Sequence, residues 1–211
     1  VIQTTHFMIP AYVRHDTREL ASQMHMPLRQ RDIYQGHQCG VSPKQIYQLS
    51  CLGAWSKKGI VDEWLRILAK TGFHAVAVEH PAASLARLTR DEALMVHTGD
   101  DGLGVLAIRD GLSYIQHYAS WRELHEEGGG RQLQHHTWAS FLVRAVQRIL
   151  NEYKHHFGRP LQRVIITQPA IEHLVRQTLR AHFRFEYTSL YLAHNLFMGG
   201  IEAYGAAVRG S

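Results

Sequence analysis

The chain has 211 residues, of which 45% are hydrophobic and 19% are charged, and its formal net charge at pH 7 is +5. This balance is typical of a globular protein and excludes a disordered or fibrous one. No stretch approaches the roughly 18 consecutive apolar residues of a membrane-spanning helix, and the first residues lack the features of a signal peptide, so we expect a soluble chain.

The first residue and the two cysteines indicate whether the chain is a fragment and in which redox environment it folds. The chain begins at Val1 rather than at a methionine, and strand-like sequence starts at once, so we expect a fragment or a truncated version of a longer protein. The only cysteines are Cys39 and Cys51, and a chain of this length can build a core without disulfides. Reduced cytosolic thiols are expected, and Cys51, with apolar neighbours, is expected to be an inert core thiol rather than a nucleophile.

The first predicted elements alternate between strand and helix. Residues 45–55 are rich in apolar, aromatic and β-branched types, which indicates a buried strand. Residues 57–72 have one apolar helical face and end at Gly72, where a left-handed C-terminal cap is expected. Residues 73–80 alternate as a strand. This strand, helix and strand succession is typical of an α/β fold.

Three consecutive strands are predicted after a short helical segment at 82–88. They are separated by turns at 100–102 and 110–111, each of which contains an Asp-Gly pair. Because Asp-Gly between apolar runs is a strong hairpin signal, we expect an antiparallel meander. The three strands cover residues 92–99, 103–111 and 112–119.

The second half of the chain is predicted to be rich in helices. Residues 120–136 are polar and contain three consecutive glycines, which favours a mobile loop or a lip over a cleft. Apolar periodicity then predicts helix, strand, helix and strand, and a small-residue segment predicts a final helix. These five elements cover residues 137–154, 163–167, 171–183, 183–189 and 199–210. Their order favours a layered α/β lobe with one antiparallel hairpin system.

Four segments carry a resemblance to a known superfamily: MVHTGDDGLGVLAIRDG, the long helix to NEYKHHFG, LQRVIITQPAIEHLVRQTL and the closing AYGAAVRG. They resemble the nucleotide-binding lobe of the actin, Hsp70 and sugar-kinase superfamily. More narrowly, the chain looks like PilM of type IV pili, the cytoplasmic part of GspL in type II secretion and the equivalent domain of BfpC. The resemblance implies actin-like, ribonuclease H-like α/β lobes with mixed sheets flanked by helices. Residues 1–90 would be part of the first lobe with a connecting segment, and residues 91–211 the second lobe.

The resemblance also implies a role in assembly rather than in catalysis. In that family PilM binds the short cytoplasmic tail of PilN, GspL binds the assembly ATPase, and neither role needs hydrolysis. We therefore expect a bacterial cytoplasmic scaffold, peripheral to or anchored at the inner membrane, that docks a PilN-like tail or the assembly ATPase. The alternative from the same superfamily is an ATP-binding ATPase or kinase.

Two loops that bind nucleotide in the superfamily have partial matches here. The glycine-rich turn could cradle phosphate through backbone amides. The competing interpretation, a plain hairpin turn, is favoured because Asp100 and Asp101 would repel phosphate without magnesium. The superfamily's first Asp-x-Gly loop has no counterpart before Gln48, and Gln168 and Pro169 replace the glycines that approach the base. We expect no cofactor, with ATP and magnesium as the alternative. The candidate nucleotide-binding residues are Thr98, Gly99, Gly102, Gly104, Thr167 and Gln168.

The spacing of residues does not favour other chemistries. Sixteen histidines invite a metal hypothesis, but no HExxH or CxxC pattern gathers ligands, so surface histidines are expected. The GxSxG elbow of Ser-His-Asp hydrolases is absent. Basic residues are spread along the chain, and no helix-turn-helix, zinc-finger or RNA-binding pattern occurs, so nucleic acid is not an expected partner.

Aromatic and basic residues in the first half are candidates for partner binding. Trp55 and Trp64 are candidate anchors because aromatic side chains dominate interface energies, while the competing interpretation places both in the core. Arg29 and Arg31 could face an acidic partner or an anionic leaflet, against ordinary solvation.

Overall fold

A computed structural model describes residues 3–10, 33–41, 47–73, 75, 80–128 and 135–190. They belong to two compact units, Val1–Ala83 and Ser84–Ser211, and the boundary falls within the short helix α3 (Pro81–Ala86). Each unit is described by itself. Among the described helices, none combines the length and the apolar composition needed to cross a lipid bilayer.

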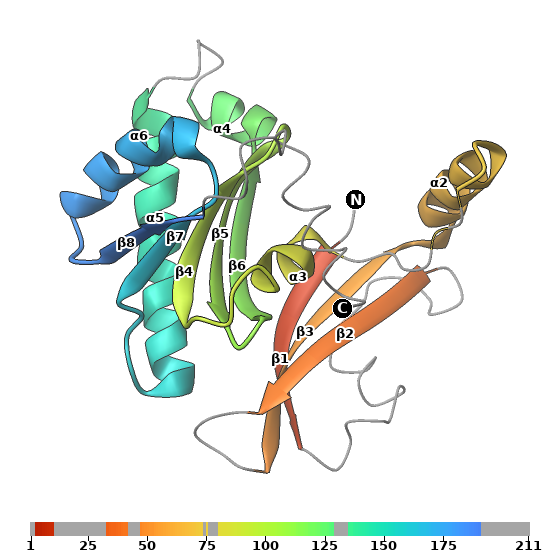
Figure 1. The fold of residues 1–211 in the computed structure, drawn as a ribbon, viewed down its shortest axis with the longest axis horizontal. Helices are drawn as coiled ribbons and strands as arrows, with labels where there is room; N and C mark the ends of the chain where they lie inside the picture. Colours follow the sequence, from red (N-terminus) through yellow and green to blue (C-terminus); the bar gives the residue numbers. More distant parts are fainter. Residues whose placement is uncertain are drawn as a thin grey trace. The chain divides into compact units, whose positions relative to one another are not determined.

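The first unit contains a three-stranded antiparallel sheet with the order β1-β3-β2 (Figure 1). Its strands are β1 (Gln3–Pro10), β2 (Ile33–Val41) and β3 (Gln48–Lys57). The strand predicted at 45–55 is confirmed as β3, whereas β2 was not predicted. Helix α2 (Lys58–Lys70) follows β3 directly, and Gly72 beyond it has a φ of +83°, which confirms the predicted left-handed cap.

The cysteines differ from expectation. Cys51 lies on β3, is fully buried and is disulfide-bonded. The sequence contains one other cysteine, Cys39 on β2, whose backbone is paired directly with that of Cys51 in the β2–β3 register. The expected burial of Cys51 is confirmed, but the expectation of a reduced thiol is wrong. Strand pairing places the two cysteine positions opposite each other, and a local sequence pattern does not show that pairing.

The second unit contains a five-stranded mixed sheet with the order β6-β5-β4-β7-β8. The first three strands in sequence form an antiparallel meander, which confirms that prediction, and β7 and β8 run parallel to β4. Asp110 and Gly111 join β5 to β6 with φ angles of +55° and +76°, as a two-residue type I′ turn requires. The strands are β4 (Ala93–Thr98), β5 (Gly102–Arg109), β6 (Leu112–Ser120), β7 (Arg163–Ile166) and β8 (Glu186–Ser189).

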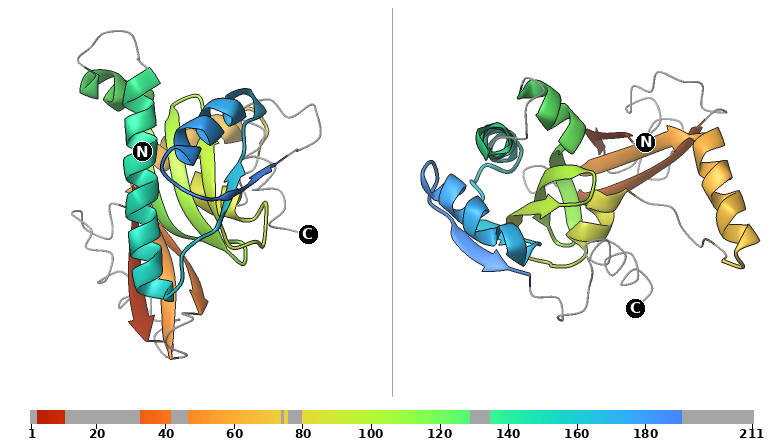
Figure 2. Two further views of the ribbon diagram at one scale, coloured as in Figure 1. Left: turned by 90° about the vertical axis from the view of Figure 1, so that its left-hand side faces the viewer. Right: turned by 90° about the horizontal axis from the view of Figure 1, so that it is seen from above.

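Two predicted helices cover one face of this sheet and complete its core. Figure 2 shows the long helix α5 (His135–Phe157) running along the sheet, and α6 (Pro169–Arg180) packs beside it. Both have one apolar face with helical periodicity, and that face is buried, as predicted. The fully buried side chains of these faces include Leu142, Val146, Ile149, Tyr153, Val175 and Leu179.

Helix α4 (Trp121–Glu127) occupies part of the segment that was expected to be a loop. It begins with a capping box: the Glu123 N–H donates to Ser120 Oγ at 3.2 Å, and the Ser120 N–H donates to the Glu123 carboxylate at 2.8 Å. The loop prediction is therefore wrong for 121–127, because the Ser-x-x-Glu spacing outweighs the polar composition. Residues 129–134 and the predicted helix at 199–210 lie outside the described residues, as does most of the strand predicted at 73–80.

Candidate functional site

The carboxyl ends of two parallel strands meet at one edge of the second unit's sheet. Val96 of β4 is paired with Ile166 of β7, so the residues that follow them emerge side by side. In open α/β sheets, ligands bind in the crevice outside such carboxyl ends. Three of the predicted nucleotide ligands gather at this edge, namely Thr98, Thr167 and Gln168.

The polar side chains at this edge bind one another. Thr98 Oγ1 donates a hydrogen bond to Gln168 Oε1 at 2.5 Å, and Thr167 Oγ1 lies 2.8 Å from His97 Nδ1. The Thr167 N–H donates to the Val96 carbonyl at 3.1 Å. His97, Thr98 and Thr167 are all buried. We call His97, Thr98, Thr167 and Gln168 the polar seam, because they join β4 to β7 through contacts within the protein.

The turn between β4 and β5 is closed by its own backbone. The Gly99 N–H donates to the Gly102 carbonyl at 2.9 Å, and the Trp121 indole N–H donates to the Gly99 carbonyl at 3.1 Å. The Trp121 backbone N–H donates to the Asp101 carbonyl at 2.9 Å. The Gly99 amide, a candidate phosphate donor, is therefore used inside a hairpin that the start of α4 holds in place.

The two remaining candidate glycines have different surroundings. A Cβ atom on Gly102 would collide with the Ala119 carbonyl oxygen and would lie 2.5 Å from the Tyr118 hydroxyl. A Cβ atom on Gly104 would meet nothing closer than the His97 carbonyl and the Tyr118 ring, both at 3.8 Å. Gly102 therefore has a structural reason, the close approach of β6, that does not involve a ligand.

Known proteins are similar to this chain in structure but not in sequence. By sequence, the chain matches no protein-family model and no curated protein. By structure, it is similar to the PilM-PilN type IV pilus biogenesis complex, with a TM-score of 0.62 and 15% identity over 99% of this chain and 76% of the other. It is also similar to the cytoplasmic domain of EpsL, an inner membrane component of the type II secretion system of Vibrio cholerae, with a TM-score of 0.54 and 12% identity over 98% and 70%.

This chain has the actin-like fold. The resemblance that the sequence segments carried is thereby confirmed at the level of fold. The polar seam and the closed β4–β5 turn contain residues that the resemblance implies as nucleotide contacts. The nucleotide role of the six candidate residues stays a prediction. Within the part of the chain that the structure describes, no group of three or more His, Cys, Asp or Glu side chains could hold a metal ion.

The predicted docking anchors of the first unit differ in exposure. Trp55 on β3 is 8% exposed, whereas Trp64 on α2 is 63% exposed. A core position, the competing interpretation, therefore holds for Trp55 and not for Trp64. Arg29 and Arg31 lie outside the described residues. On the described surface, Trp64 is the candidate anchor that a partner can reach.

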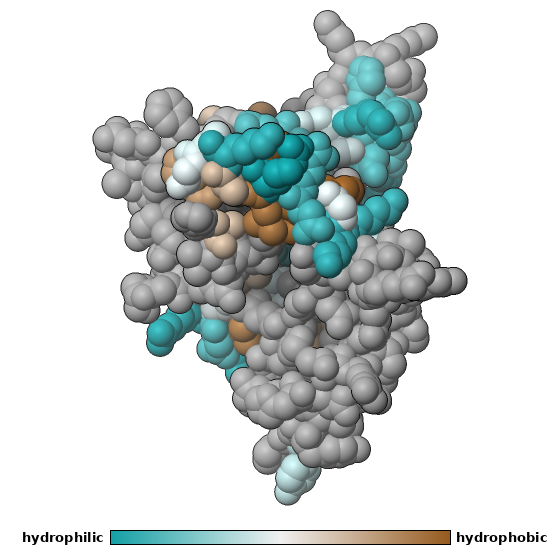
Figure 3. Space-filling view, turned by 90° about the vertical axis from the view of Figure 1, so that its right-hand side faces the viewer, coloured by the Kyte–Doolittle hydropathy of each residue, from teal (hydrophilic) through white to brown (hydrophobic). Residues whose placement is uncertain are grey.

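Trp64 belongs to an exposed apolar stripe on α2. At 3.6 residues per turn, the stripe covers about 100° of the helix surface. Val61, on the adjoining side, is the residue of α2 that is buried. Figure 3 faces the side where α2 lies in Figure 1 and shows hydrophobic surface beside hydrophilic surface. The stripe, called the α2 stripe below, consists of Ile60, Trp64, Ile67 and Leu68, which are 37–63% exposed, and Phe73 is 67% exposed beyond the helix end.

Proposed function

We propose that this chain is a non-enzymatic scaffold of a type IV pilus or type II secretion assembly, located in the cytoplasm at the inner membrane. It docks the cytoplasmic tail of a membrane subunit and the assembly ATPase. The similar structures support this role, because one is a complex of PilM with PilN and the other belongs to an inner membrane component of a secretion system. In this proposal residues 1–90 are part of the first actin-like lobe and residues 91–211 form the second.

The α2 stripe is the observation that carries the docking role. Each Å² of apolar surface removed from water contributes about 25 cal/mol, so a contiguous exposed apolar surface favours association. Tryptophan is among the residue types most enriched at interface hot spots. We assign the stripe to a PilN-like tail, with Trp64 as its anchor.

The polar seam supports a role without catalysis. A catalytic site directs polar groups at the position of the reacting atoms. Here Thr98 and Gln168 bind each other, and Thr167 binds His97. These contacts stabilise the junction of β4 with β7, which is what a rigid docking platform needs.

The disulfide at Cys51 is the observation that opposes a cytoplasmic location, because reducing conditions in the cytosol keep most protein thiols reduced. Acid quenching of intact cells, followed by alkylation of the denatured protein and non-reducing electrophoresis, measures the state of Cys51 directly. Free thiols in cells support the cytoplasmic assignment, and a disulfide in cells contradicts it.

Calorimetric titration with the cytoplasmic tail of the PilN-like subunit from the same bacterium tests the docking role. We expect saturable binding, and Trp64→Lys should weaken it at least about 30-fold, the loss of a hot spot worth ~2 kcal/mol. Tyr47→Lys is the matched control, since Tyr47 is an aromatic residue of the same unit that is 83% exposed and lies outside α2. Equal losses in both variants, or no binding by the unmodified chain, would contradict the proposal.

A parallel titration with Mg-ATP tests the alternative, an ATP-binding ATPase or kinase. A ligand that binds only the folded state must raise the melting temperature. The polar groups of the polar seam and of the β4–β5 turn bind one another, so we expect neither binding heat nor a shift in the melting temperature. Saturable micromolar binding would instead favour the nucleotide role of Thr98, Gly99, Thr167 and Gln168.

A further inference from the structure

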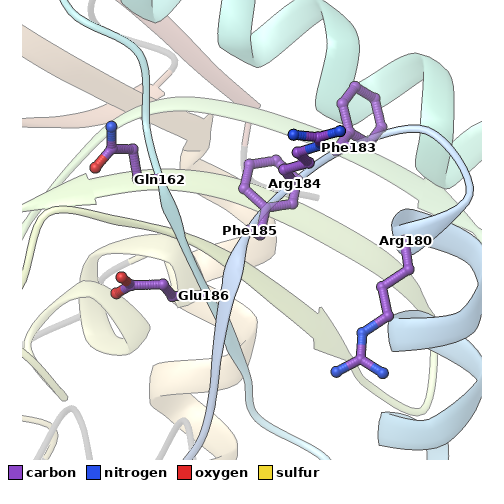
Figure 4. A pocket seen from close by; sticks show the side chains of 6 residues that line it. All are labelled: Gln162, Arg180, Phe183, Arg184, Phe185 and Glu186. Carbon is purple, nitrogen blue, oxygen red and sulfur yellow. The ribbon is translucent and has the colours of Figure 1, made fainter.

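A pocket of about 520 Å³ lies in the second unit, where α6 ends and the chain enters β8. Figure 4 shows Arg180 at the end of α6, the segment from Phe183 to Glu186 that leads into β8, and Gln162 on the neighbouring segment that enters β7. We call it the α6–β8 pocket. None of its lining residues belongs to the α2 stripe or to the polar seam, and the proposed function assigns it no role.

The α6–β8 pocket contains two arginines with no acidic partner among the described residues. Arg180 lies over the Tyr187 ring at 5.4 Å and forms no described ion pair, and none is found for Arg184 either. Arg176, one turn earlier on α6, is by contrast paired with Glu172 at 2.6 Å. The two arginines are exposed, and a guanidinium offers five N–H donors in a fork that matches a carboxylate.

An aromatic row lies beside these charges. The rings of Phe183 and Phe185 are 5.5 Å apart, and those of Phe185 and Tyr187 are 6.3 Å apart. All three side chains are half-buried against the core of the second unit, so their positions are fixed by packing. They offer apolar surface next to the guanidinium groups.

Strand β8 is the outermost described strand on its side of the sheet. Its inner edge is bonded to the β7 segment: the Glu186 N–H donates to the Gln162 carbonyl at 2.9 Å, and the Leu190 N–H donates to the Ile166 carbonyl at 3.0 Å. Successive residues of a strand direct their backbone groups to opposite edges. The N–H and C=O groups of Tyr187 therefore point away from β7, toward the position that an added strand would take.

We propose that the α6–β8 pocket and the outer edge of β8 bind an extended acidic peptide segment of a protein partner. The peptide backbone pairs with β8, its acidic side chains bind Arg180 and Arg184 separately, and an apolar side chain contacts the phenylalanines. A peptide uses all three features together, whereas a free anion would use only the arginines. Glu186, the one acid of the pocket, lies 3.9 Å from Arg163, and the pocket keeps an excess of positive charge. This second docking site goes beyond the proposed function and does not depend on it.

Fluorescence anisotropy with a labelled octapeptide of alternating valine and glutamate tests this site. We expect saturable binding that weakens as salt is added, since exposed charges are screened. The double variant Arg180→Glu and Arg184→Glu should weaken it at least tenfold. Arg122→Glu is the matched control, because Arg122 is an exposed arginine on another helix, α4, with Glu126 as its partner at 3.4 Å. Unfolding curves of all variants establish that each is folded.

Two further probes separate the parts of the proposal. An octapeptide with glutamine in place of glutamate should bind at least tenfold more weakly, which tests the carboxylate. Two octapeptides, one N-methylated at its valine amides and the other at its glutamate amides, each block one edge of the peptide strand. At least one of them should lose binding, which tests strand addition. No binding of the original peptide, equal loss in the Arg122→Glu variant, or unchanged binding of both N-methylated peptides would overturn the proposal. The tail titration with Trp64→Lys is independent of all these outcomes.

Discussion

Helices α2 and α6 differ in what covers their apolar sides. They have 13 and 12 residues, and both are amphipathic. Helix α6 buries Val175 and Leu179 completely against the core of the second unit. Helix α2 buries Val61 and leaves the α2 stripe exposed. The same periodicity thus serves packing in one unit and leaves an exposed apolar surface in the other.

A matched pair of leucine substitutions tests this comparison most strongly. Leu179→Ala on α6 removes a side chain with 0% exposure and should cost about 3 kcal/mol of unfolding free energy. Leu68→Ala on α2 removes one that is 37% exposed and should cost less than about 1 kcal/mol. Urea unfolding followed by circular dichroism measures both, with each transition fitted separately if the units unfold independently. Equal costs would mean that the α2 stripe is covered in the folded protein.

A pair of glycine substitutions sharpens the contrast inside the second unit, with the next largest effect. Gly102→Ala forces β5 and β6 apart at the Ala119 carbonyl and should cost about 1–3 kcal/mol, as overpacking does. Gly104→Ala has room for its methyl group and should change stability by less than about 0.5 kcal/mol. The same unfolding experiment compares the two. If Gly102→Ala were neutral, the structural explanation of this glycine would fail.

The elements that sequence reasoning predicted are those with local signals. Asp110 and Gly111 predicted a hairpin because an Asp-Gly pair tolerates the positive φ angles of its turn. The capping box at Ser120 was also a local signal, and the polar composition after it was given too much weight. Strand β2, by contrast, contains Gly36 and Gly40 among polar residues and is defined by its pairing with β3. Pairing between distant segments has no local signature.

The candidate sites show the same limit. Thr98, Thr167 and Gln168 were predicted as ligands from a resemblance, but Thr98 and Gln168 are 70 positions apart in sequence and meet because β4 and β7 are parallel neighbours. Their mutual hydrogen bonds depend on that geometry. On α2, the spacing of Trp64 and Leu68 correctly predicted one apolar face. Periodicity identifies such a face without identifying what covers it, so the competing core interpretation of Trp64 was wrong.

The smallest predicted effect is a change in the stability of the second unit with pH, caused by His117. His117 on β6 is partly buried beneath α5, and its Nε2 atom has no hydrogen bond among the described residues, although it lies 3.9 Å from Glu152. Burial lowers the pKa of His117 below its ordinary value, and Arg148 lowers it further, while Glu152 opposes the shift. Between the lowered pKa and the ordinary value near 6.5, the unfolded chain binds the proton and the folded chain does not.

The stability of the second unit should therefore fall as the pH drops below about 6.5, and it should be fully present above that value. His117→Gln removes this contribution, so the difference in unfolding free energy between the unmodified chain and the variant should change with pH across this window. Urea unfolding at several pH values between 5 and 8 measures that difference, with His173→Gln on the exposed side of α6 as the matched control. A constant difference for His117→Gln would show that burial does not disfavour its charged form in the folded protein, which would contradict this prediction.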